Sequence, residues 1–141
     1  AGFIYDYKDY DYTKTAWNLV QKYNYPYKFY YISFTDMSRT YRFNILDKKV
    51  IRNETMLFQA MDDFLKAAQP ADGKVDEWYQ GALGLLRGVA IRFFRFNGNY
   101  ARFCTLPHIL NFILLANAEQ LTHFLEGDVM AKTVAGGFIG S

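Results

Sequence analysis

Two groups of charged residues in this sequence have the types and spacing that binding chemistry uses. The first is Asp6-Tyr7-Lys8-Asp9, which directly follows the apolar run Gly2-Phe-Ile-Tyr5. Open α/β sheets place their ligand-side loops after the carboxyl ends of parallel strands, so Asp6 could face a nucleotide or a metal ion and Lys8 a phosphate. The alternative is a turn whose acidic residues cap the following helix. These residues alone leave both interpretations open.

The second group consists of four arginines in the second half of the chain. They are Arg87, Arg92, Arg95 and Arg102, and they alternate with Phe93, Phe94, Phe96, Tyr100 and Phe103. Arginine beside aromatic rings could track a phosphate backbone and stack bases, which makes these arginines candidates for binding single-stranded DNA. We favour the structural alternative, in which Arg92 and Arg95 complement a helix C-terminus while the rings pack into a core. Another basic group is equally well explained as a solvated loop: Arg39, Arg42, Lys48, Lys49 and Arg52.

Other kinds of catalytic site find little support. His108 and His123 lack a metal-ligating partner at helical spacing, and Cys104 has no CxxC partner, so neither a metal site nor a thiol site is predicted. Neither a Walker A sequence nor a GxGxxG sequence occurs, so the chain alone is not expected to hydrolyse ATP or to hold a cofactor. Two carboxylate pairs are better explained by a solvated helix face and a helix start: Asp62-Asp63 and Asp76-Glu77.

Composition sets the frame for these sites. With 141 residues, of which 51% are hydrophobic, the chain can bury one sizeable core. A formal net charge of +2 is too small to indicate a nucleic-acid binder by itself. A single cysteine excludes an internal disulfide framework. No signal peptide is recognisable, and the longest apolar stretch, at 109–116, is far shorter than the roughly 20 residues that span a bilayer. We expect a soluble, cytoplasmic chain.

The first 46 residues predict a strand, helix, strand unit. Phe3 to Asp6 and Lys28 to Phe34 are aromatic and β-branched, as in strands. Thr13 to Tyr23 has apolar residues at helical spacing, with Thr13 as its N-cap. A connection of this length favours parallel strands with a crossover helix. Two strands are not stable alone in water, so we expect this βαβ segment to belong to a larger sheet.

Residues 47–141 predict a second domain, a bundle of four to five helices. The predicted helices are Glu54 to Ala68, Val75 to Phe96, Leu106 to Ala116, Ala118 to Glu126, and a segment from Val129 onward. Thr105, Asn117 and Asp128 are the expected N-caps of the last three. The predicted fold is therefore mainly α, with a short βαβ segment in front of the bundle.

The order of these elements resembles the type IV coupling proteins of bacterial conjugation, the TraG/TraD-like ATPases. In that family a strand ends in Asp-Pro-Lys-Gly, and a second strand leads to an Asn-Pro-Leu segment that opens an inserted all-α domain. Asp6 and Lys8 match the first motif, with Tyr7 and Asp9 in place of Pro and Gly. Asn44 and Leu46 match the second, with Ile45 in place of Pro.

Two further segments extend the likeness over nearly the whole chain. They are Asp76-Glu-Trp-Tyr79, which resembles the entry to that all-α domain, and Thr105-Leu-Pro-His-Ile-Leu110, which resembles its threonine-capped helix. The tyrosine-rich sequence is most similar to TraG-like members from conjugative transposons of Bacteroides-type bacteria.

The resemblance implies a hexameric motor, anchored in the bacterial inner membrane, that uses ATP and Mg²⁺ to deliver a relaxase-bound DNA strand to a type IV secretion channel. This chain would be its all-α domain together with a sliver of the RecA-like motor domain, near whose nucleotide site Asp6 and Lys8 would lie. The implied partners are a relaxase or a relaxosome accessory protein, and single-stranded DNA.

Two other functions remain as alternatives. The chain could be a stand-alone helical protein-interaction module without a motor, in which case its βαβ face should be self-sufficient. It could also be a nucleotide-dependent transferase that uses Asp6 and Lys8, although no other residues converge on them.

Overall fold

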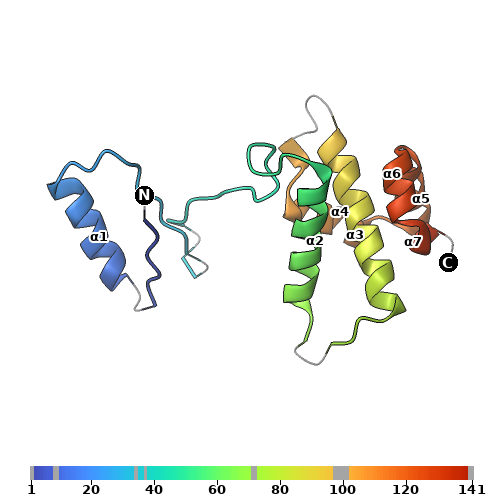
Figure 1. Cartoon of the computed structure of the whole chain (residues 1–141), viewed down its shortest axis with the longest axis horizontal. Coiled ribbons are helices and arrows are strands. Elements are labelled where there is room, and N and C mark those ends of the chain that lie inside the picture. The colour runs from blue at the N-terminus through green and yellow to red at the C-terminus, as the bar shows by residue number, and fades with distance from the viewer. Residues whose placement is uncertain are drawn as a thin grey trace. The chain divides into compact units, whose positions relative to one another are not determined.

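The computed structural model describes residues 2–7, 10–33, 35–36, 38–70, 73–96 and 102–139, and this part of the chain is mainly helical, as predicted (Figure 1). It divides into two compact units, Ala1–Phe43 and Asn44–Ser141, which are called unit 1 and unit 2 below. Within the described residues, no helix combines the length and the apolar character needed to cross a membrane.

Within its described residues, unit 1 contains the predicted helix but not the predicted strands. Helix α1 spans Asp11–Lys22 and has no buried residue. It begins two residues before Thr13, the expected N-cap, and is preceded by Tyr10 in the left-handed region at φ 80°. The described residues on either side, 2–7 and 28–33, form no strand. Strands need neighbours to accept their hydrogen bonds, and within the described part of unit 1 no sheet supplies them.

Unit 2 contains six helices in its described residues, one more than the upper limit predicted. They are α2 (Glu54–Ala68), α3 (Glu77–Arg95), α4 (Leu106–Leu115), α5 (Ala118–Glu126), α6 (Val129–Val134) and α7 (Gly136–Ile139). The extra helix arises because the segment from Val129 onward is divided at Ala135 into α6 and α7.

Side-chain caps fix where these helices begin. The carboxylate or hydroxyl of Asp76, Thr105 and Asp128 accepts a hydrogen bond from the first turn of α3, α4 and α6, respectively. Asn117 and Gln120 form a capping box, in which each side chain accepts the other residue's backbone N–H. The predicted N-caps of α4, α5 and α6 are therefore confirmed.

Helix α3 is the centre of unit 2 and contacts each of its other five helices. Figure 1 shows α2 along one side of it and α6 along the other. The core of unit 2 contains fully buried side chains from each of α2 to α6, among them Leu57, Met61, Val89, Ile91, Ile109, Leu125 and Ala131. Apolar side chains that recur at helical spacing produce this core because each helix turns one stripe towards α3.

Two glycines of α3 permit the close approach of α6. A Cβ on Gly84 would lie 2.6 Å from the Val134 carbonyl oxygen, and one on Gly88 would lie 2.9 Å from the Ala135 Cβ. By contrast, a Cβ on Gly81 would meet no atom within 4 Å. Only the first two glycines are therefore required by packing.

Alanine substitutions at Gly84 and Gly81 should have opposite effects on stability. Gly84→Ala should lower the free energy of unfolding by about 1–3 kcal/mol, because a backbone oxygen must move. Gly81→Ala should raise it by about 0.5–1 kcal/mol, because alanine restricts the unfolded chain and favours the helix. Urea unfolding followed by circular dichroism measures both. Equal effects of the two substitutions would contradict the close packing of α3 against α6.

Candidate nucleic-acid interface

Asp6 is engaged with the start of α1. Its Oδ2 accepts hydrogen bonds from the Thr13 backbone N–H at 2.8 Å and from the Thr13 hydroxyl at 2.7 Å. Thr13 lies in the first turn of α1, where backbone N–H groups lack partners within the helix. The sequence allowed two interpretations of Asp6, as a nucleotide or metal contact or as a cap of the following helix. This hydrogen-bonded contact is the capping role. Lys8, the other residue of that candidate site, lies outside the described residues.

Arg87 and Arg95 are paired with carboxylates on neighbouring helices. The Arg87 guanidinium forms a two-pronged contact with Asp62 of α2, with its Nε donating to Oδ1 at 2.8 Å. Arg95 bridges Glu54 at the start of α2 and Asp128 at the N-cap of α6, at 2.6 and 2.9 Å. Both arginines therefore hold helices together, and their charge is offset within the protein.

Arg92 points to α5 and meets a different set of groups. Its Nε donates to the Phe124 carbonyl oxygen at 2.9 Å. Its guanidinium also lies over the rings of Phe96 and Phe124, 5.3 and 5.1 Å from their centroids. Arg102, by contrast, is exposed and lies over the Phe103 ring at 4.8 Å. Each of the four predicted arginines thus contacts a different set of groups, and the four do not form one site.

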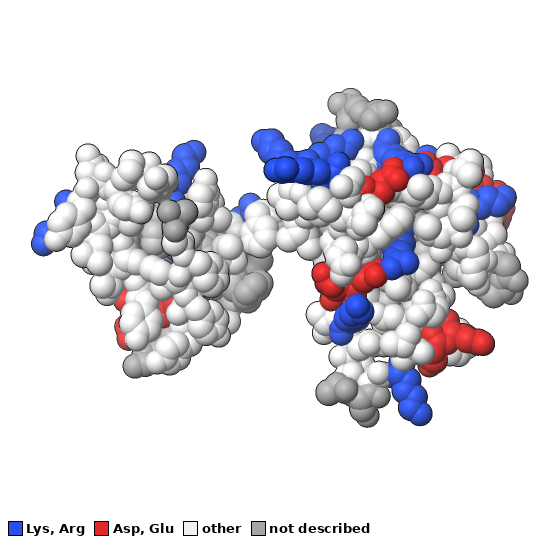
Figure 2. Space-filling model, in the orientation of Figure 1, with Lys and Arg blue, Asp and Glu red and all other residues white. Residues whose placement is uncertain are grey.

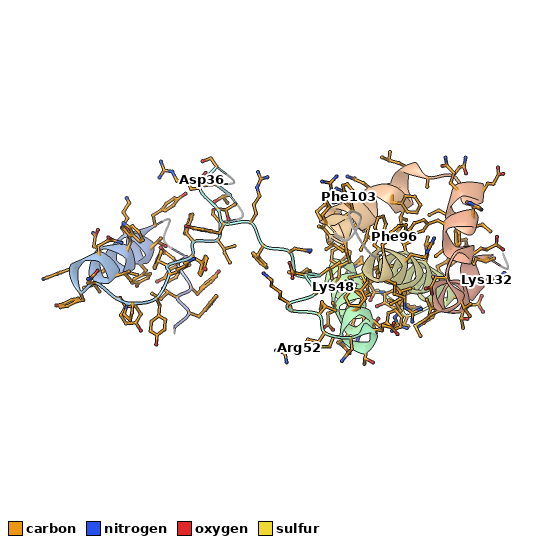
Figure 3. All side chains as sticks on the ribbon, turned by 90° about the horizontal axis from the view of Figure 1, so that it is seen from above. Asp36, Lys48, Arg52, Phe96, Phe103 and Lys132 are labelled. Atoms are coloured by element: carbon orange, nitrogen blue, oxygen red, sulfur yellow. The ribbon has the colours of Figure 1, made fainter. Side chains whose placement is uncertain are left out.

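A separate basic surface lies where α2 begins and α3 ends. This surface, the basic end of unit 2, is defined by Lys48, Lys49, Arg52 and Arg102, all of which are exposed. Figure 2 shows Lys and Arg side chains gathered at this end, and Figure 3 shows Lys48 and Arg52 on the loop that leads into α2. Within the described residues, no carboxylate lies within salt-bridge distance of any of the four.

The loop that carries three of these cations is held in place by hydrogen bonds and burial. The Asn44 amide donates to the Cys104 carbonyl oxygen at 2.7 Å and accepts the Leu46 backbone N–H at 3.0 Å. Leu46 and Ile51 are buried in the core, so the loop is pinned at both ends. Between them, the Asp47 carboxylate accepts the Lys49 backbone N–H at 2.8 Å. The basic side chains consequently project from a fixed backbone.

Aromatic groups lie beside the basic end, as in surfaces that bind single-stranded nucleic acid. The Lys48 ammonium is 5.5 Å from the centroid of the Phe94 ring, and Phe103 packs edge-on against His108. From the sequence, Lys48, Lys49 and Arg52 are equally well explained as a solvated loop, because nothing local shows that Asn44 joins their loop to Cys104, two residues after Arg102. Arg39 and Arg42 of the same sequence group belong to unit 1, where Arg39 lies 3.7 Å from Asp36.

The surroundings of Cys104 and the spacing of possible metal ligands can be compared with what thiol and metal chemistry need. Cys104 is buried, and burial raises the pKa of its thiol to about 11, against a smaller opposite effect of the Lys48 charge. A thiol with so high a pKa carries little nucleophilic thiolate at neutral pH. In the part of the chain that the structure describes, no three histidine, cysteine or acidic side chains are grouped so that they could hold a metal ion.

Comparisons of the chain with protein-family models, with curated proteins and with solved structures found no match. The assignment of a function therefore depends on the residues and their geometry.

Asp128 gives the fold a predictable pH dependence. Burial alone would raise the pKa of its carboxyl, but hydrogen bonds from the Ala131 N–H and from Arg95 outweigh burial and lower it. Because the pKa is lowered in the folded state, the stability that the charge contributes is present above the unfolded pKa, about 3.9, and is lost as the pH falls through the folded value.

Asp128→Asn keeps an oxygen that can cap α6 but removes the charge that Arg95 meets. We expect it to lower the free energy of unfolding at neutral pH by about 1 kcal/mol, with the difference from the wild type vanishing in acid as the pH falls through the folded pKa of Asp128. Urea unfolding across this pH range tests the expectation. Glu119→Gln, an exposed acid at the start of α5, is the control and should change little. A difference that persists in acid would place the effect in the cap instead of the ion pair.

Proposed function

We propose that this chain is the cargo-recognition part of a conjugative DNA-transfer ATPase, a type IV secretion coupling protein. Unit 2 would be the all-α domain that receives a relaxase or a relaxosome accessory protein together with the single-stranded DNA attached to it. The observation that carries the proposal is the basic end of unit 2. All four of its cations are exposed, Lys48 and Arg102 lie over the rings of Phe94 and Phe103, and within the described residues none of the four has a carboxylate partner.

The two residues that match the family's second motif support this proposal through their structural roles. Asn44 opens unit 2 and braces the loop against Cys104, and Leu46 is its first buried core residue. Both residues therefore lie at the start of unit 2, where the chain of the proposed protein would leave the motor domain and enter the all-α domain. The matched positions also fix the backbone from which Lys48, Lys49 and Arg52 project.

The exposed aromatic side chains of unit 1 support the proposal that this unit packs against a larger sheet in the intact protein. Many of its large apolar side chains are exposed, including Phe3, Tyr5, Tyr23, Tyr30 and Phe43. In the intact protein, segments 2–7 and 28–33 would become strands when neighbouring strands of the motor accept their hydrogen bonds, which would complete the βαβ segment. Asp6 and Lys8 would then follow a strand end near bound ATP and Mg²⁺, with Asp6 anchored by its contact with Thr13.

The remaining parts of the proposal concern the intact protein. It would be a homo-hexamer anchored in the bacterial inner membrane, with this chain on the cytoplasmic face. Without a Walker A sequence the chain itself is not expected to turn over ATP. A stand-alone helical interaction module is the second candidate, since unit 2 has a continuous core of its own.

The reading frame that encodes the chain distinguishes the two candidates. For the motor, we expect a Walker A sequence in frame shortly before the codon for Gly2 and a second acidic strand end of the Walker B type after the codon for Gly136. Determination of the genomic sequence measures this directly. A frame without either motif would overturn the assignment to a DNA-transfer ATPase and leave the interaction module.

Charge reversal at the basic end tests the contact with DNA. The triple variant Lys48→Glu, Lys49→Glu, Arg52→Glu should weaken binding of fluorescent oligo(dT) by at least about tenfold at low salt. It should also flatten the dependence of affinity on salt, because fewer counterions are released when fewer phosphates are neutralised. Fluorescence anisotropy at several salt concentrations measures both effects.

The control is the double variant Lys66→Glu, Lys74→Glu, which reverses two exposed lysines elsewhere on unit 2. This control should keep most of the affinity. If wild-type binding did not respond to salt, or if both variants lost affinity equally, the basic end would not be the DNA contact.

A further inference from the structure

An open pocket of about 580 Å³ lies on another part of unit 2, among the end of α3, α4 and α5. Its lining includes Arg92 and Phe96 from the end of α3, and Gln120, His123 and Phe124 from one face of α5. Figure 3 labels Phe96 at the point where α3 ends. The pocket therefore combines aromatic surface with one arginine, the polar side chains of Gln120 and His123, and one acid, Glu126.

The guanidinium of Arg92 is fixed in one orientation at this pocket. Phe96 and Phe124 hold it through their ring faces, and the Phe124 carbonyl oxygen accepts from Nε. That carbonyl belongs to the last turn of α5, where the helix dipole favours a cation. Gly127 follows directly, and any Cβ there would collide with the guanidinium. With Nε used, the terminal Nη groups are the donors left for a ligand.

The two neighbouring arginines of α3 have a different kind of contact from Arg92. Arg87 and Arg95 each meet at least one carboxylate of an adjacent helix. Arg92 instead meets a carbonyl and two rings at the wall of an open pocket. Charge complementarity therefore points to a carboxylate that arrives from outside the chain.

The rim of the pocket adds polar contacts that suit a peptide. The Gln120 Oε1 accepts the Asn117 backbone N–H at 3.0 Å, which leaves its Nε2 as a donor for a peptide carbonyl. Glu126 at the rim is 3.3 Å from the Lys132 ammonium, so its charge is offset and opposes an incoming carboxylate only weakly. His123 is exposed one turn after Gln120 and can accept or donate.

We propose that this pocket binds an acidic segment of a protein partner, in which a Glu or Asp side chain meets Arg92 and an adjacent aromatic side chain packs on Phe96 and Phe124. This inference names the kind of protein segment that unit 2 receives, and so it rests on the proposed function as a cargo-recognition domain. A nucleic acid fits less well, because Arg92 is the one arginine or lysine among the described residues that line the pocket, whereas a phosphate backbone needs several cations.

The first test uses a defined peptide and the full 141-residue chain. The probe is a capped pentapeptide with the sequence glycine, phenylalanine, glutamate, phenylalanine, glycine, and its match has glutamine in place of glutamate. In a ¹⁵N NMR titration up to about 5 mM, the glutamate peptide should shift the amide resonances of Gln120, His123 and Gly127. The glutamine peptide should bind at least about tenfold more weakly. No shift at these amides, or equal affinities, would overturn the proposal.

Variants then test whether Arg92 is the residue that binds the carboxylate of the peptide. Arg92→Gln should abolish the preference for the glutamate peptide, whereas Arg102→Gln, the same change at an arginine outside the pocket, should keep it. Because Arg92→Gln could unfold the chain, the exposed His123 provides a second pair of variants. His123→Glu should weaken binding of the glutamate peptide several-fold and His123→Lys should strengthen it. Identical affinities in that pair would also overturn the proposal.

Competition with oligo(dT) separates this inference from the proposed function. If oligo(dT) shifts the same pocket amides and displaces the peptide, the pocket is a nucleic-acid site and the peptide proposal is wrong, while a DNA-transfer role still stands. If the peptide binds as expected but the reading frame holds no motor, the pocket proposal survives in a stand-alone interaction module. The two ideas can therefore fail independently.

Discussion

The close approach of α6 to α3 is the constraint on which the rest of unit 2 depends. Gly84 and Gly88 let the two backbones come so near that a side chain at either position would strike α6 or Ala135. This approach places Asp128, at the start of α6, within reach of Arg95 at the end of α3. Arg95 also meets Glu54, so one guanidinium joins both flanks of the central helix. Small residues in the middle of α3 thereby help to set an ion-pair bridge at its C-terminal end.

The arginines of α3 show how a cluster in sequence separates in space. An α-helix turns by about 100° per residue, so Arg92 lies roughly 140° around the helix from Arg87. Arg87 consequently faces α2, while Arg92 faces α5 and lines a pocket. The basic end gains its charge elsewhere, from a pinned loop and from Arg102. Arg87 and Arg95 therefore meet carboxylates inside the bundle, whereas the cations of the basic end have no carboxylate partner within the described residues.

The two candidate surfaces of unit 2 differ in chemistry. Several cations beside aromatic rings suit a chain of phosphates and bases, whereas one fixed guanidinium in an aromatic pocket suits a single carboxylate. The cargo in the proposed function, a relaxase joined to a DNA strand, would present both kinds of group at once. A cargo-recognition domain that contacted protein and DNA through separate surfaces could select the joined complex over either component, because two linked contacts bind more tightly than one.

The sequence by itself determined where most helices of the chain lie, and it suggested that Asp6 could cap a helix. Caps such as Asn117 and Asp128 act over three residues or fewer, and apolar stripes repeat within one helix, so both can be recognised locally. Only the tertiary structure decided the partners of Arg87, Arg92 and Arg95, since their contacts join residues 25, 32 and 41 positions apart. It also decided that 2–7 and 28–33 remain without strand pairing, because a strand requires a neighbour that its own sequence does not contain.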